Sequence, residues 1–462
     1  MKLKLIATAA VLSAVSYSAS SQAKLVEKIE RKGSELIIPY EKYVLPNGLT
    51  LVVHEDHSDP VVHVDVTYHV GSAREEIGKS GFAHFFEHMM FQGSDNVGDE
   101  QHFKVVTEAG GTLNGSTNRD RTNYYETVPS NQVEKMLWLE ADRMGFLLDA
   151  VTQQKFEVQR ATVKNERGQN YDNQPYGLTG EVSAKNLYPY GHPYSWLTIG
   201  YIEELNKVSV GDLKNFFLRW YGPSNATVTV GGDVKTADIV KAVEKYFGTI
   251  PRGPEVKPVK LEPVVLDKDR YVSYVDNYAR AAQLRIVYPT VPDYHKDMVA
   301  LACLSQVLGG GGGGGRGGRG GGNRNSVFYQ FFIKDQKALQ ASSSSQLSEL
   351  AGEFSVSVTP YPGKSLAEME KLVGEAFAEF EKRGITDEDI EKFRSGYENR
   401  AINGLASVSG KVSQLAAFQT YTGNPNMIGQ QIKMYQGRCD AGVQPVYKGQ
   451  APCGIECADE RR

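Results

Sequence analysis

The stretch from Gly81 to Ser94 reads GFAHFFEHMMFQGS and places two histidines and a glutamate among phenylalanines and methionines. Each of these polar side chains loses hydration on burial, so it needs a hydrogen bond or a metal. On a helix, His84 and His88 are four residues apart, and both rings can reach one cation. Glu87 is displaced around the helix and is placed to act as a general base on a metal-bound water. The stretch therefore predicts either a zinc-binding helix or two core histidines beside an exposed glutamate.

Zinc suits these residues, since imidazole nitrogens are good ligands for it and a catalytic site uses three protein ligands and a water. Two histidines leave the third ligand to be found elsewhere in the chain. The order His-x-x-Glu-His inverts the commoner His-Glu-x-x-His of zinc peptidases. Because three fixed residues recur by chance in long chains, the surrounding sequence has to decide between the two interpretations.

The length of 462 residues predicts at least two domains. A formal charge of -4 gives no electrostatic reason to expect a nucleic-acid partner. The N-terminus carries Lys2 and Lys4, an apolar run from Leu5 to Val15 and small residues up to Ala23. This pattern is typical of a bacterial secretory signal, so we expect residues 1–23 to be cleaved and the protein to be periplasmic or secreted. The sequence contains no apolar run long enough to predict a membrane span.

Strand and helix patterns mix along the chain without strict alternation. Alternating apolar residues predict strands at 49–56, 61–71, 122–128 and 225–232, and helical periodicity predicts helices at 100–110, 130–144, 153–170 and 236–250. This mixture predicts an α+β fold in which helices pack on a mainly antiparallel sheet. In the segment 61–71, His63 and His69 fit the polar face of a half-buried strand.

A proline-rich segment, residues 251–265, predicts a linker. After it, a predicted strand at 281–290 and a predicted helix at 295–308 repeat the order of the first half. We therefore expect two similar domains, residues 24–260, which would bind zinc, and residues 261–462. Within the second domain, the glycine- and arginine-rich residues 309–322 predict a loop insertion, and the residues after about Gln436 predict an irregular tail.

Three segments around these motifs carry a resemblance to a known family. They are GSAREEIGKSGFAHFFEHMMFQGS, EAGGTLNGSTNRDRTNYYETV and FEVQRATVKNERGQNYDNQPYG. In this order and spacing they resemble the pitrilysin/insulinase family of zinc peptidases, which includes the mitochondrial processing peptidases. The resemblance implies one zinc ion per chain, held by His84, His88 and Glu166, with Glu87 as the general base. It also implies that a sheet edge binds the peptide substrate through Asn114, Gly115 and Thr117.

The same resemblance implies an exported zinc metalloendopeptidase that hydrolyses short or unfolded peptides. Members of the family close two halves around the peptide, and this chain resembles one half of such a clamshell. The second half of a member offers an arginine and a tyrosine to the substrate, where this chain has Ile333 or Lys334 and Gln340. We therefore expect a partner, either a homologous half or a second copy of the chain. The alternative is a catalytically silent binding or scaffolding subunit of a peptidase-like complex.

Overall fold

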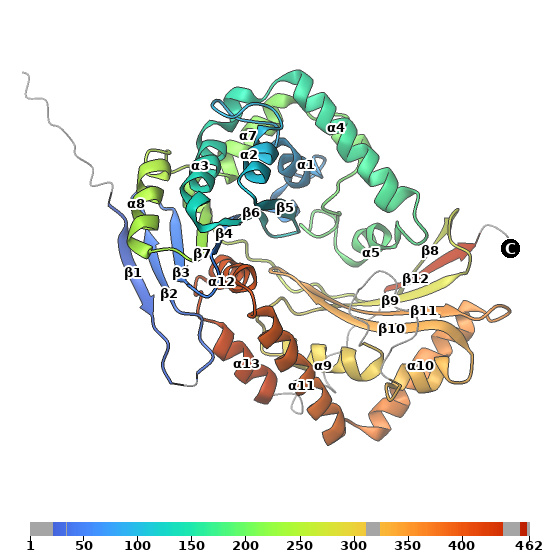
Figure 1. The fold of residues 1–462 in the computed structure, drawn as a ribbon. Coiled ribbons are helices and arrows are strands. Elements are labelled where there is room, and N and C mark those ends of the chain that lie inside the picture. The colour runs from blue at the N-terminus through green and yellow to red at the C-terminus, as the bar shows by residue number, and fades with distance from the viewer. Residues whose placement is uncertain (1–21, 34, 311–323, 438–452, 460–462) are drawn as a thin grey trace, which may run out of the picture.

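The protein is described here by a computed structural model that covers residues 22–33, 35–310, 324–437 and 453–459 (Figure 1). Two mixed sheets are packed with helices, which confirms the predicted α+β fold with two similar units. Residues 1–21 of the predicted signal and residues 311–322 of the predicted insertion lie outside the described residues. Within the covered ranges, no helix combines the length and the apolar character needed to cross a bilayer.

The first sheet has the strand order β1-β2-β3-β7-β4-β6-β5. Its strands are β1 Lys24–Ile29, β2 Tyr40–Val44, β3 Thr50–Glu55, β4 Val61–Tyr68, β5 Thr112–Thr117, β6 Thr122–Pro129 and β7 Ala226–Gly232. Neighbouring strands pair antiparallel except β3 and β7, which are parallel. Strand β5 therefore stands at one edge, with its outer side open to another strand.

Helices of the first half build the core on one face of this sheet. They are α1 Phe82–Met89, α2 Gln101–Glu108, α3 Val133–Ala150, α4 Gln153–Arg167, α6 Ile202–Leu205, α7 Val210–Trp220 and α8 Thr236–Phe247. Helix α5 Thr179–Leu187 belongs to the same half but packs on the second sheet. Short helical turns are η1 Ser72–Arg74, η2 Ser130–Gln132, η3 Gly168–Asp172, η4 Pro223–Asn225 and η5 Tyr329–Ile333. Phe86 of α1, Phe217 of α7 and Phe247 of α8 belong to one buried cluster with Val64 of β4. The sequence around the histidines is apolar because α1 forms part of this core.

The second sheet has the strand order β10-β11-β9-β12-β8. Its elements are β8 Arg270–Asp276, β9 Gln283–Thr290, α9 Met298–Leu308, β10 Ala338–Leu347, β11 Gly352–Pro360, α10 Leu366–Arg383, α11 Asp387–Gly404, α12 Val408–Thr422, α13 Ile428–Gly437 and β12 Cys453–Asp459. The expectation of an irregular tail is wrong for β12, which pairs with both β8 and β9. Cys453, Ile455 and Cys457 alternate along β12 and are buried, and this burial explains the strand.

The two units repeat one topology. The order β3-β7-β4-β6-β5 in the first sheet corresponds to β8-β12-β9-β11-β10 in the second. The single parallel pair, β3 with β7, corresponds to β8 with β12. The helices follow the same order, since α10 comes after β11 as α3 comes after β6. Among the described elements, however, no helix follows β12 as α8 follows β7.

Each unit also covers the sheet of the other. Helix α12, from the second half of the chain, packs on β4 and β7, and α5 packs on β9 and β12 (Figure 1). The contact is close at Gly231 of β7, where an added Cβ would lie 2.4 Å from Val412 Cγ2. As a result, His63 and Asp65 of β4 are buried, and the expectation of a half-buried strand is wrong. The face of β4 that carries His63 and Asp65 is covered by α12, a helix far away in the sequence.

Candidate metal centre

The start of helix α1 is held by one buried carboxylate. Glu75 accepts hydrogen bonds from the backbone N–H of Gly81 at 2.9 Å and of Ala83 at 2.8 Å, and from Trp196 Nε1 at 2.9 Å. Burial raises the pKa of Glu75 to about 8. Gly81 has a φ of 90°, a left-handed conformation that favours glycine. These contacts fix the position from which the two histidines project.

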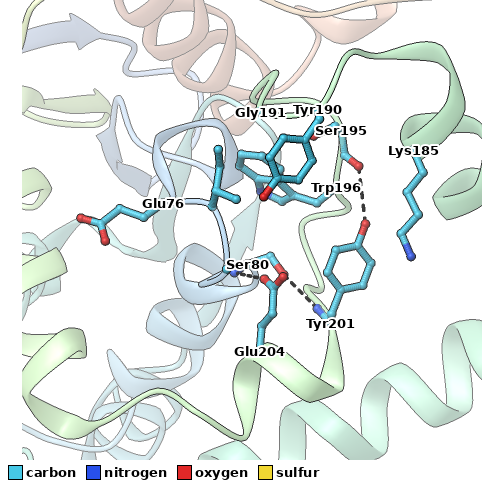
Figure 2. Close-up of a pocket in the computed structure, with 11 residues that line it drawn as sticks. Glu76, Ser80, Lys185, Tyr190, Gly191, Ser195, Trp196, Tyr201 and Glu204 are labelled. Carbon is cyan, nitrogen blue, oxygen red and sulfur yellow. Dashed lines mark hydrogen bonds between the residues drawn. The ribbon is translucent and has the colours of Figure 1, made fainter.

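A hollow beside this loop contributes to the same support (Figure 2). Ser80 donates its backbone N–H to Glu204 at 2.7 Å, and its hydroxyl accepts from the N–H of Tyr201 at 3.0 Å. The side chains of Trp196 and Tyr201 line the hollow, as Figure 2 shows. None of the three expected metal ligands lines it. The hydrogen bonds of Ser80 with Glu204 and Tyr201, beside this hollow, therefore anchor the loop that precedes α1.

Helices α1 and α4 bring the expected ligands together. The neighbouring residues Phe85 and Phe86 turn into the core, so His84 and His88 lie on the other side of α1. Glu166 is in the last turn of α4, which packs beside α1. Its Oε2 lies 3.5 Å from His84 Nε2 and 3.2 Å from His88 Nε2. Folding thus joins one sequence motif to a carboxylate of a separate helix.

These distances fit a tetrahedral zinc ion. Ligand atoms about 2.1 Å from such an ion are about 3.4 Å from one another. The two measured separations, 3.2 and 3.5 Å, lie on either side of this value, and all three ligand atoms lie within 4.8 Å of one another. Burial lowers the pKa of His84 to about 4, so its imidazole is neutral at pH 7, the form that binds a metal.

Glu87 and the edge strand β5 adjoin this cluster. Burial raises the pKa of Glu87, and a hydrogen bond with Thr117 opposes that rise. Gly115 makes room for the glutamate, since an added Cβ would lie 3.3 Å from Glu87 Cγ and 3.2 Å from Tyr124 Cδ1. Asn114 is exposed, and its Oδ1 accepts from the backbone N–H of Gly115 at 2.8 Å. The expected general base and the expected peptide-binding segment are therefore neighbours.

A second group of possible ligands, His102, Glu126 and Glu140, is fully buried under the sheet. Arg143 forms ion pairs with both Glu140 and Glu126, the latter at 3.5 Å. Its guanidinium already supplies the positive charge that a cation would bring, so this group does not fit a metal. Our sequence analysis missed it, although Glu126 stands in the apolar phase of its strand, between Tyr124 and Val128.

The second unit carries the three residues that stand where the family resemblance implies an arginine and a tyrosine. Ile333 is half-buried in η5, and Lys334 follows it directly. Gln340 is exposed on β10, the edge strand of the second sheet. The structure therefore offers no arginine or tyrosine at these three positions.

Comparisons with known proteins identify the family. The family model described as "Insulinase (Peptidase family M16)" matches residues 50–187, and the model described as "Peptidase M16 inactive domain" matches residues 207–397. The chain is 30% identical over 376 residues to zinc protease PqqE of Helicobacter pylori, covering 80% of this chain and 81% of that protein.

Solved structures agree with this match. A protease from Helicobacter pylori superposes with a TM-score of 0.80 at 25% identity, covering 91% of this chain and 99% of that one. The periplasmic protease PqqL of Escherichia coli has the same fold, with a TM-score of 0.71 at 15% identity, and 94% of this chain covers 48% of that chain. The chain belongs to the M16, or insulinase, family of peptidases.

Proposed function

We propose that this chain is a zinc metalloendopeptidase that holds one zinc ion through His84, His88 and Glu166. The observation that carries the proposal is the meeting of these side chains at 3.2 and 3.5 Å. Two imidazoles and one carboxylate form a ligand set that leaves a coordination position open. When bound there, zinc lowers the pKa of a coordinated water and polarises the carbonyl of a peptide bond.

Glu87 acts as the general base. Its carboxylate takes a proton from the attacking water and later passes that proton to the leaving amine. The enclosed position of Glu87 favours this role, because burial raises the pKa of the carboxyl group above its usual value. Thr117, at the end of β5, orients the carboxylate through their hydrogen bond.

The substrate is a short or unfolded peptide that adds to β5 as a further strand. An open sheet edge binds an extended chain through main-chain hydrogen bonds, so it accepts varied sequences. Asn114, Gly115 and Thr117 lie on this edge strand. A folded protein has few free extended segments to offer, which restricts the enzyme to flexible substrates.

A second homologous half, or a second copy of the chain, completes the enzyme around the peptide. This chain matches about half of the length of PqqL, a protein described as periplasmic. Because of this match, and because residues 1–23 have the pattern of a secretory signal, we place this protein in the periplasm or outside the cell. The alternative, a silent scaffolding subunit, is disfavoured because the sequence has both histidines, Glu166 and Glu87.

The test combines metal analysis with peptide digestion. We expect the purified chain and its Glu87→Gln variant to bind one zinc each, and the variant to hydrolyse peptides about 10²- to 10⁴-fold more slowly. Glu166→Gln should lose zinc. Glu157→Gln is the matched control on α4, because Glu157 is exposed and is not one of the ligands. A chain without zinc, or a fully active Glu87→Gln variant, would contradict the proposal, and full activity of the isolated monomer would remove the need for a partner.

A further inference from the structure

A large cavity lies between the two units at the end of the edge strand β5, and we name it the β5 cavity. It encloses about 870 Å³, and its lining includes Thr117 of β5, Tyr171 of η3, Gln346 and Ser348 of the second unit, and Tyr421 of α12. Thr117 also shares a hydrogen bond with Glu87, the proposed general base. A peptide that pairs with β5 therefore runs beside this cavity.

Tyr171 connects the β5 cavity to the metal centre. Helix α4 carries Glu166 in its last turn and continues directly into η3. Asn173 donates its N–H to the carbonyl oxygen of Gly168 at 3.0 Å, the i→i+5 hydrogen bond of a π-helix. This wider turn brings residues five apart, such as Glu166 and Tyr171, closer to one side than an α-helix would. Burial and the nearby negative charge of Glu166 raise the pKa of Tyr171, in agreement with this placement.

The turn that carries Tyr171 is held firmly from both units. Its carbonyl oxygen accepts from the N–H of Gln174 at 3.3 Å, and a Cβ added to Gly177 would lie 2.0 Å from the same oxygen. The hydroxyl of Tyr176 donates to the carbonyl oxygen of Ala281, in the second unit, at 2.7 Å. The ring of Tyr171 packs against the core of the first unit, whereas its hydroxyl makes no hydrogen bond with any residue that the structure describes. A hydrogen-bond donor is therefore held in place and left free for a ligand.

A peptide on β5 has groups that need such a donor. A strand at the edge of a sheet pairs with one neighbour only, so alternate carbonyls of the added peptide point away from β5. Each of these carbonyls needs a donor from another element or from water. Two carboxylates of the cavity are already engaged, since Asp120 accepts from the Tyr194 hydroxyl at 2.6 Å and Glu349 lies 2.7 Å from His69 Nε2. The free phenol therefore suits a main-chain carbonyl, which carries no charge.

We propose that Tyr171 is a substrate-binding residue, whose hydroxyl donates a hydrogen bond to a main-chain carbonyl of the peptide that β5 leaves unpaired. The inference rests on the proposed peptidase function and adds a second main-chain contact to the one that the edge strand supplies. Every peptide has such carbonyls, so the contact strengthens binding without selecting a sequence.

The test measures peptide binding by the full-length Glu87→Gln protein, in which hydrolysis is slow. The probes are two labelled peptides of unrelated sequence, those of residues 338–347, ALQASSSSQL, and residues 270–276, RYVSYVD, followed by fluorescence anisotropy. Tyr171→Phe should weaken the binding of both by about 2- to 10-fold, the effect of one uncharged hydrogen bond, with zinc and after chelation. Tyr190→Phe is the matched control, because Tyr190 is 91% exposed and lies outside the β5 cavity.

Hydrolysis gives a second measurement in protein that keeps Glu87. A hydrogen bond made equally to the bound peptide and to the transition state affects KM alone, so Tyr171→Phe should raise KM by the same factor and change kcat by less than about twofold. A lower zinc content or melting temperature of Tyr171→Phe would instead show that the residue supports Glu166 or the turn.

Three results of the binding experiment would overturn the role of Tyr171. Equal binding with and without Tyr171→Phe would refute this role and leave the proposed peptidase function standing. Weakened binding of only one of the two peptides would indicate contact with a side chain rather than with the main chain. No binding of either peptide to protein that keeps Tyr171 would overturn the proposed function together with this inference.

Discussion

Replacing Gly231 by alanine should destabilise the contact that interlocks the two units. Gly231 lies in β7 under α12, and its new Cβ would be 2.4 Å from Val412 Cγ2. Two carbon atoms in contact normally lie about 3.5 to 4.0 Å apart, so the overlap is at least about 1 Å. Val412 is fully buried, and a close-packed interior cannot absorb this overlap without a shift of the helix.

The size of the effect follows from the cost of overpacking, about 1 to 3 kcal/mol. A change of rotamer gives little relief, because a valine on a helix has one strongly preferred χ1. For a domain of this size, each 1 kcal/mol lowers the melting temperature by about 2 to 4 °C. Thermal and urea unfolding of Gly231→Ala should both show this loss, and Gly374→Ala, which has open space around it, should not.

A double-mutant cycle separates this contact from a general weakening of β7. Val412→Ala removes the methyl groups that the new Cβ meets, so the double variant should be more stable than the sum of the single effects predicts, by about 1 kcal/mol or more. If Gly231→Ala unfolds at the wild-type temperature, or if the two effects simply add, α12 does not rest on β7 and the interlocked arrangement is wrong.

Three further changes test the site and its support. Gly115→Val crowds Glu87, so peptide hydrolysis should fall at least about tenfold while zinc content is unchanged; an active variant would show that the glycine is dispensable. Glu75→Ala leaves the buried backbone N–H groups of Gly81 and Ala83 unpaired, at about 1 to 3 kcal/mol each, and should lower the melting temperature more than Glu75→Gln does. Burial lowers the pKa of His63 to about 4, so the folded state binds fewer protons than the unfolded state between about pH 4 and 6.5. Stability should fall as the pH drops through this window, by about 2 kcal/mol at pH 5 from this residue, and His63→Gln should lose that part of the dependence in urea unfolding at each pH.

The local sequence pattern was sufficient to predict strands and helices that surround the site. The alternation in β4 and the helical periodicity in α3 and α8 are properties of neighbouring residues, and the sequence predicted all three elements. The spacing of His84 and His88 predicted that both rings face one way on a helix. The third expected ligand, Glu166, came from resemblance alone, since no spacing rule connects residues on two separate helices.

The sequence by itself determined the motif and most of the strands and helices near it, because these depend on side chains within one or two turns of each other. Tertiary structure decided which distant surfaces meet. His63 is buried under α12, and Arg143 lies between Glu126 and Glu140. Cys453 lies in β12, a strand of 7 residues whose own pattern did not predict its pairing in the second sheet. Burial on both faces of a strand, and pairing between strands far apart, depend on the whole packed chain rather than on any local stretch.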